Sequence, residues 1–88
     1  MYMRLVQVRV KPDSLPELRR MYLERVIPAL HGVTGCLFAN LIQSEQHSEE
    51  CISMTLWDDR SQAETYEKSG KFKELLRGVS PFLADTSE

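Results

Sequence analysis

Hydrophobic and polar residues alternate along three short stretches of the chain. Within residues 3–10, Val6, Val8 and Val10 alternate with Gln7 and Arg9, which is the period of a β-strand with one buried face. Residues 36–43 and 50–57 have similar patterns, and the segment 44–49 between them is wholly polar. We therefore expect three strands, the second and third of which form a β-hairpin.

The intervening segments have the spacing of amphipathic helices. Apolar side chains recur every three or four positions over residues 15–27, and Pro28 is expected to bend or end that helix. After the third strand, one helix runs to Ser69-Gly70 and another to Pro81, beyond which no strand pattern follows. The predicted order is strand, helix, strand, strand, helix, helix, without a fourth strand. Residues 1–88 then form one α+β domain with an antiparallel sheet and its helices on one face.

The length of the hairpin turn determines which residues of the second and third strands oppose each other. If residues 44–49 form the turn, Cys36 opposes Trp57 and Ile42 opposes Cys51, and each strand alternates between two faces. The helix-covered face would carry Val6, Val8, Val10, Leu37, Ala39, Leu41, Ile52, Met54 and Leu56. The opposite, mixed face would carry Leu5, Gln7, Arg9, Cys36, Phe38, Asn40, Ile42, Ser53, Thr55 and Trp57.

The mixed face contains an apolar patch formed by Leu5, Phe38, Ile42 and Trp57. A patch of this kind usually marks an interface, and a second copy related by a two-fold axis is the simplest way to cover it. We therefore expect a homodimer that associates through the sheet. The two cysteines do not oppose each other in this register, so we expect no disulfide and a reducing, cytoplasmic setting.

Composition excludes several classes of protein. The 88 residues suffice for one domain, and the formal net charge of −2 with dispersed basic residues argues against a nucleic-acid partner. No apolar stretch is long enough to span a membrane. His31 is expected at a helix end and His47 in a polar loop, and the spacing of the cysteines indicates no metal site.

Several motifs stand near the end of the third strand and at two earlier turns. They are Trp57-Asp58-Asp59-Arg60-Ser61-Gln62-Ala63 with Tyr66, Ser69-Gly70 and Phe72, then Val10-Lys11-Pro12, and Ile27-Pro28-Ala29-Leu30 leading to Gly35-Cys36. Over residues 3–82 the chain resembles the antibiotic biosynthesis monooxygenase family. The resemblance implies a ferredoxin-like α+β fold paired into a dimeric α/β-barrel. Domains of that family end with a fourth strand, which the pattern of this sequence does not provide.

The resemblance also implies a function. It indicates a monooxygenase that needs no bound cofactor and acts on a quinol or another phenolic small molecule. In the phenol-oxidising branch an Asn stands four residues before the tryptophan, where this chain has Ser53. The candidate catalytic residues are Trp57, Tyr66 and Arg77, and the candidate substrate-binding residues are Tyr22, Asn40 and Phe72. An arginine could hold a phenolate through its fork of donors, and a tyrosine could donate a hydrogen bond.

Structural roles compete with each of these assignments. The tyrosines could be core residues, Trp57 a core or interface anchor, and Arg77 a solvated helix end. The haem-degrading branch of the fold is disfavoured, because Leu76 stands where the iron-ligating histidine would be. The alternative to an enzyme is a non-catalytic dimeric domain that binds a small molecule or serves regulation or stress response. A cavity lined by the aromatic residues favours the enzyme, and a filled interior favours a structural role.

Overall fold

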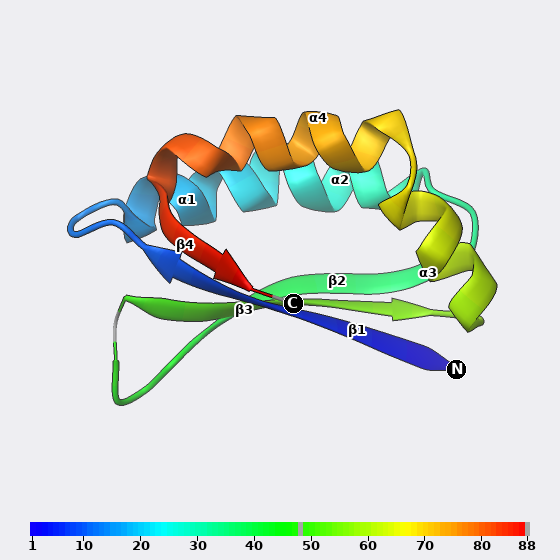
Figure 1. Cartoon of the computed structure of the whole chain (residues 1–88), viewed down its shortest axis with the longest axis horizontal. Helices are drawn as coiled ribbons and strands as arrows, with labels where there is room; N and C mark the ends of the chain where they lie inside the picture. Colours follow the sequence, from blue (N-terminus) through cyan, green and yellow to red (C-terminus); the bar gives the residue numbers. More distant parts are fainter. Residues whose placement is uncertain (48, 88) are drawn as a thin grey trace.

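The computed structural model describes residues 1–47 and 49–87, and it has one sheet covered on one face by helices (Figure 1). The sheet is antiparallel, with the strand order β2-β3-β1-β4. Its strands are β1 (Tyr2–Val10), β2 (Cys36–Gln43), β3 (Glu50–Trp57) and β4 (Leu83–Ser87). The helices are α1 (Leu15–Met21), α2 (Ile27–His31), α3 (Arg60–Glu67) and α4 (Gly70–Val79). The α+β ferredoxin-like class and the placement of the helices on one face are confirmed.

The prediction that the chain has no fourth strand is wrong. β4 pairs antiparallel with the β1 residues from Gln7 to Val10, with a register shift between Arg9 and Val10. The Lys11 amide, just beyond β1, also donates to the Phe82 carbonyl oxygen at 2.9 Å. The sequence of β4 does not alternate, so its extended backbone is favoured by pairing with the open edge of β1 rather than by its own side chains.

A β-bulge changes the register of the β2–β3 hairpin. Cys36 opposes Trp57 as predicted, but the register then shifts by one residue, so that Phe38 opposes Leu56 and Ile42 opposes Ile52. A shift of one residue exchanges the two faces of a strand relative to its partner. The predicted face of β3 is therefore wrong. Its side of the sheet beneath the helices carries Cys51, Ser53, Thr55 and Trp57, and its opposite side carries Ile52, Met54 and Leu56.

The first helical run does not end at Pro28. A π-helical turn, Tyr22–Val26, joins α1 to α2, and the Ile27 amide donates to the Tyr22 carbonyl oxygen, five residues earlier. Proline at position 28 has no N–H to donate and its ring crowds the carbonyl oxygen four residues before it. A widened turn accommodates both effects while the helix continues to His31.

Side-chain hydrogen bonds begin the last two helices. The Asp59 carboxylate accepts from the Gln62 amide at 3.0 Å before α3, and the Ser69 hydroxyl oxygen accepts from the Phe72 amide at 3.3 Å before α4. Hydrogen bonds from Ser61 and Gln62 hold the pKa of Asp59 below its usual value. These caps set the direction in which each helix leaves the preceding turn. No helix among residues 1–47 and 49–87 is long and apolar enough to cross a membrane.

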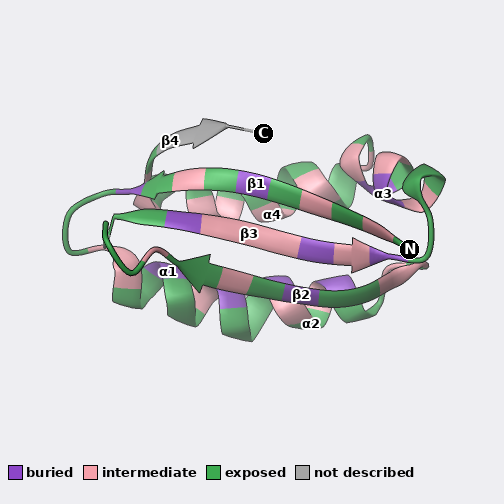
Figure 2. Cartoon of the chain, turned by 90° about the horizontal axis from the view of Figure 1, so that it is seen from below, coloured by how far each residue is buried: buried purple, intermediate pink, exposed green. Residues whose placement is uncertain are grey.

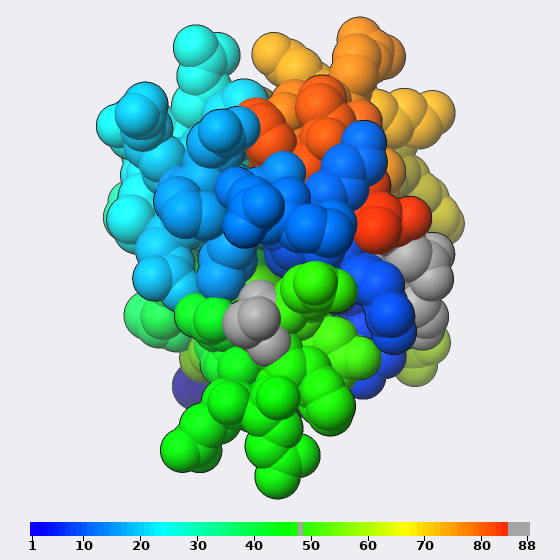
Figure 3. Space-filling model, turned by 90° about the vertical axis from the view of Figure 1, so that its left-hand side faces the viewer, coloured from blue at the N-terminus to red at the C-terminus, as the bar shows by residue number. Residues whose placement is uncertain are grey.

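The core lies between the sheet and the helices, in two adjoining clusters. The larger cluster consists of Tyr22, Val26, Leu30, Ala39, Trp57, Ala63 and Tyr66, and the smaller of Val10, Leu18 and Cys51. Of the residues predicted on the helix-covered face of the sheet, Val6, Val10 and Ala39 are buried. Figure 2 shows the opposite side of the sheet, where green and pink segments of β1, β2 and β3 lie uncovered. At the end of the molecule shown in Figure 3, exposed residues of the β2–β3 connection project beyond the body.

Candidate functional site

A cavity of about 300 Å³ lies between the sheet and the helices. Its walls come from all four strands, the first helical run, α3 and α4, and they are mainly aliphatic. Five of its lining residues carry polar groups, namely Arg4, Tyr22, Ser53, Thr55 and Tyr66. A mainly apolar cavity with a few inward polar groups is the usual form of a small-molecule site, and this volume is at the small end of the range.

The π-helical turn places Tyr22 at one end of this cavity. The Tyr22 hydroxyl donates to the Asn40 carbonyl oxygen at 3.2 Å and lies 2.9 Å from the Ser53 hydroxyl, with which it shares a further hydrogen bond. Burial raises the pKa of Tyr22, and the hydrogen bond to Ser53 partly opposes that rise. Tyr22 is therefore a neutral, oriented phenol at neutral pH, held by two strands of the sheet.

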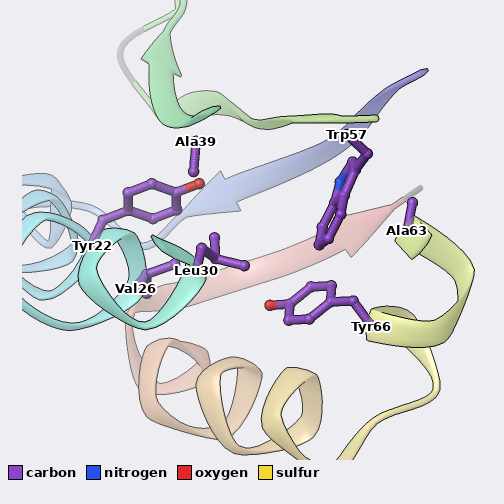
Figure 4. Close-up of a cluster of buried hydrophobic side chains, with 7 residues drawn as sticks. All are labelled: Tyr22, Val26, Leu30, Ala39, Trp57, Ala63 and Tyr66. Carbon is purple, nitrogen blue, oxygen red and sulfur yellow. The ribbon is translucent and has the colours of Figure 1, made fainter. Parts of the chain in front are cut away.

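Tyr66 reaches the cavity from α3, and it packs against two aromatic rings. Its ring centroid lies 5.2 Å from that of Trp57 and 5.5 Å from that of Phe72. The hydroxyls of Tyr22 and Tyr66 point inward from opposite ends of the cluster (Figure 4). Among the described residues the Tyr66 hydroxyl has no hydrogen-bond partner, and burial raises its pKa to about 12. This hydroxyl can donate to, or accept from, a bound molecule.

Trp57 packs against Tyr66 from outside the cavity. Its side chain is fully buried, and its indole N–H donates to the Thr55 hydroxyl oxygen at 2.8 Å. Trp57 contacts the ring of Tyr66 and does not itself line the cavity. The structure thus brings together four of the six residues selected from the sequence, Tyr22, Trp57, Tyr66 and Phe72.

Arg77 and Asn40 lie apart from these four. Arg77 is exposed in the last turn of α4 and does not line the cavity. The Asn40 side chain is exposed, and its amide oxygen accepts from the Leu41 backbone N–H at 2.9 Å. Only the backbone carbonyl of Asn40 reaches the helix side of the sheet, where it accepts from Tyr22.

Sequence reasoning missed Arg4. Its side chain is only 11% exposed and lines the cavity from β1. The signal was available, because Arg4 stands two positions before Val6 on a strand of period two and therefore shares the helix-facing side. An arginine on the helix-facing side differs from the valines that follow it. A charged side chain among apolar ones on this face marks Arg4 as a candidate site residue.

Neither cysteine is arranged as a nucleophile. Cys36 and Cys51 are free thiols, and burial raises the pKa of both. A raised pKa keeps a thiol protonated at neutral pH, which lowers its reactivity. Within residues 1–47 and 49–87, no three His, Cys, Asp or Glu side chains gather as a metal-ligand set.

Comparison with a family model places this geometry in context. Residues 1–78 match the model described as antibiotic biosynthesis monooxygenase. The match includes β1, the first helical run, the hairpin, α3 and nearly all of α4, and so it contains every described aromatic residue of the cavity. A search of curated proteins found no match.

Solved structures with the same fold are similar over nearly the whole chain. A Bordetella bronchiseptica protein provisionally described as an antibiotic biosynthesis monooxygenase has a TM-score of 0.87 at 15% identity, over 98% of this chain and 88% of that one. A Deinococcus radiodurans protein with the same provisional description has a TM-score of 0.81 at 12% identity, over 99% and 86%. A conserved protein of Methanosarcina mazei has a TM-score of 0.79 at 22% identity, over 97% and 85%. At these identities the likeness shows the fold alone.

Proposed function

Because this chain belongs to the antibiotic biosynthesis monooxygenase family, we propose that it oxidises a phenolic or quinol molecule held in the cavity between sheet and helices. The observation that supports this proposal most directly is the cavity itself, about 300 Å³ of mainly apolar space with the Tyr66 hydroxyl at its wall. A purely structural interior would be filled by its own side chains, as protein cores normally are.

The proposed reaction balances without an added reductant. When a phenol is oxidised to a quinone by one O₂, one oxygen atom enters the ring and the other leaves as water with two hydrogens from the substrate. The substrate supplies all four electrons that the oxygen molecule accepts. The protein then has to position the ring and exclude water, which lowers the entropic part of the barrier.

Two tyrosines are suited to position such a substrate. Tyr66 has a hydroxyl available to a ligand oxygen, and the rings of Trp57 and Phe72 restrict its movement. Tyr22 is held by Ser53 and the Asn40 carbonyl and can share its remaining hydrogen-bonding capacity with a ligand. We assign Trp57 and Phe72 the role of packing partners that orient Tyr66.

The same proposal includes a homodimer formed through the uncovered side of the sheet. That side carries exposed Met3, Leu5, Phe38 and Ile42, each 44–53% exposed in the single chain. The register adds Ile52, Met54 and Leu56 between them, so the surface is more apolar than the sequence predicted. A second copy packed against this surface would bury it, because a two-fold axis makes one such patch self-complementary.

Both cysteines are unpaired thiols, which supports a reducing, cytoplasmic setting.

Oxygen consumption tests the proposed function. The intact protein is mixed with a panel of phenols and quinols in air-saturated buffer without an added reductant, and uptake is followed with an oxygen electrode. We expect uptake with at least one substrate, and a roughly tenfold to hundredfold lower kcat/KM in Tyr66→Phe, which loses one hydrogen bond to a charged or polarised oxygen. Tyr2→Phe is the matched control, because it removes a tyrosine hydroxyl that does not line the cavity.

The outcomes separate the two classes of function. Binding of phenols without any oxygen uptake would contradict the oxygenase and favour the non-catalytic ligand-binding domain. Uptake that Tyr66→Phe and Tyr2→Phe leave equally unchanged would contradict the role assigned to Tyr66.

A further inference from the structure

Arg4 is the only cationic side chain that lines the cavity among the described residues. It lies opposite Thr55 on β3 and shares the helix-facing side of β1 with Val6. Its side chain is 11% exposed, so the guanidinium has lost most of its contact with water. Desolvation of a charge is costly unless the charge is paired, and an aliphatic residue would fill this position at lower cost.

Three elements meet at the guanidinium. Its Nε and Nη2 atoms both donate to the Glu67 Oε1 atom of α3, at 3.3 and 3.0 Å. Its central carbon lies 4.9 Å from the ring centroid of Phe72 on α4, a cation–π contact. Arg4 is thus held in place beside the ring that supports Tyr66.

Arg4 also borders a second hollow. A groove of about 200 Å³ runs along the outer side of β1 and α3, and its lining includes Tyr2, Leu5, Ala63 and Glu67. Arg4 is the one described residue that lines both this groove and the cavity. The groove follows the part of β1 before Gln7, where the described pairing with β4 begins. Arg4 therefore stands between the cavity and the surface.

Building on the proposed binding of a small aromatic molecule, we propose that Arg4 is the specificity-determining residue of the cavity and selects aromatic ligands that carry an anionic oxygen, such as a phenolate. The cavity supplies apolar contact for the ring, and the guanidinium supplies a planar set of donors for the charged oxygen. The Arg4 charge also opposes the rise in the pKa of Tyr66, which indicates that its field reaches the hydroxyl inside the cavity.

Glu67 competes with the ligand for the guanidinium. Its side chain is 34% exposed, so its carboxylate keeps contact with water while it is paired with the guanidinium. A neutral ligand supplies no negative charge that could replace the Glu67 carboxylate at the Arg4 guanidinium. The ion pair therefore discriminates between charged and neutral molecules of the same shape, because only the charged one replaces what the guanidinium gives up.

A pair of probes of nearly equal shape tests this proposal. The dissociation constants of 4-nitrophenol, at a mildly alkaline pH where it is ionised, and of neutral 4-nitrotoluene are measured by titration calorimetry on the intact protein. In the wild type we expect the anion to bind at least about tenfold more tightly than the neutral probe, as a hydrogen bond to a charged group provides. Arg4→Met should bring this ratio close to one, Arg4→Lys should retain part of it, and Glu67→Gln should increase it severalfold.

Two matched variants complete the experiment. Arg9→Met removes the same charge from the same strand outside the cavity, and Arg77→Met removes the exposed arginine of α4; both should keep the wild-type ratio. Circular dichroism confirms folding of each variant. A ratio that depends on Arg77 rather than on Arg4 would overturn the proposal, and so would a wild type that binds neither probe. Equal affinity for the two probes, with oxygen uptake intact, would overturn the role of Arg4 and leave the proposed oxygenase standing.

Discussion

The indole N–H of Trp57 donates to the hydroxyl oxygen of Thr55 at 2.8 Å, and both side chains are buried under the helices. The two residues are two positions apart on β3, so they share one face of the strand. This bond satisfies the only polar side-chain atom of a fully buried tryptophan and fixes the ring against which Tyr66 packs.

Loss of this hydrogen bond should destabilise the fold. Thr55→Val keeps the shape of the side chain but leaves the Trp57 N–H buried without an acceptor, which costs about 1–3 kcal/mol. Urea denaturation followed by tryptophan fluorescence measures the change. Thr55→Ser keeps the hydroxyl and should lose less stability than the valine variant. Equal stability of wild type and Thr55→Val would show that the bond contributes nothing.

Gly35 is required by the turn that precedes β2. Its φ is +88°, and a Cβ at this position would overlap the side chain of Gln62. Gly35→Ala should therefore lower the free energy of unfolding by about 2 kcal/mol or more, from backbone strain and from displacement of Gln62. Thermal unfolding measures this effect. Gly70→Ala is the control, since a Cβ there meets nothing within 4 Å and alanine favours the helix; an equal loss in both variants would contradict the argument.

Alkaline pH should weaken the fold through Tyr66. Its pKa is about 12 in the folded protein against an ordinary value of 10.0, because burial disfavours the phenolate. The unfolded chain therefore releases this proton first as the pH rises. The stabilising contribution of neutral Tyr66 is complete below about pH 10 and is lost progressively between pH 10 and about 12.

Absorbance of the phenolate measures this effect during a pH titration of the folded protein. A late-titrating fraction should be present in the wild type and reduced in Tyr66→Phe, and urea midpoints should fall less steeply with pH in that variant. Burial also raises the pKa of Tyr22, so Tyr22→Phe should remove a further part of the late fraction. Titration of both Tyr22 and Tyr66 near pH 10 in a protein that is still folded would contradict the prediction.

The uncovered side of the sheet should determine the oligomeric state. Phe38 is 44% exposed there and opposes Leu56, so Phe38→Glu would introduce a charge into the proposed interface. We expect sedimentation equilibrium to give twice the chain mass of 10.2 kDa for the wild type and a monomer for this variant. Leu23→Glu, an exposed position on the helical layer, should remain a dimer. A wild type that sediments as a monomer at micromolar concentration would refute the proposed dimer.

Local signals in the sequence determined the helices and most of the strands. The caps at Asp59 and Ser69 and the proline after α4 act over three or four residues, so their effects could be predicted without knowledge of the fold. The aromatic candidates Tyr22, Trp57, Tyr66 and Phe72 came from the family resemblance rather than from local signals, and they do gather in one region.

The tertiary structure decided which face each residue occupies and where the chain finds its partners. One bulge after Cys36 places Ser53, Thr55 and Trp57 beneath the helices. The pattern of side chains along the strand does not predict where a bulge occurs. β4 formed because β1 offered unpaired backbone groups, although its own sequence does not favour a strand. The cavity and the Arg4–Glu67 pair depend on contacts between residues far apart in the chain. Alternation and capping are local and can be read from one segment, whereas register, edge pairing and burial are properties of segments in contact.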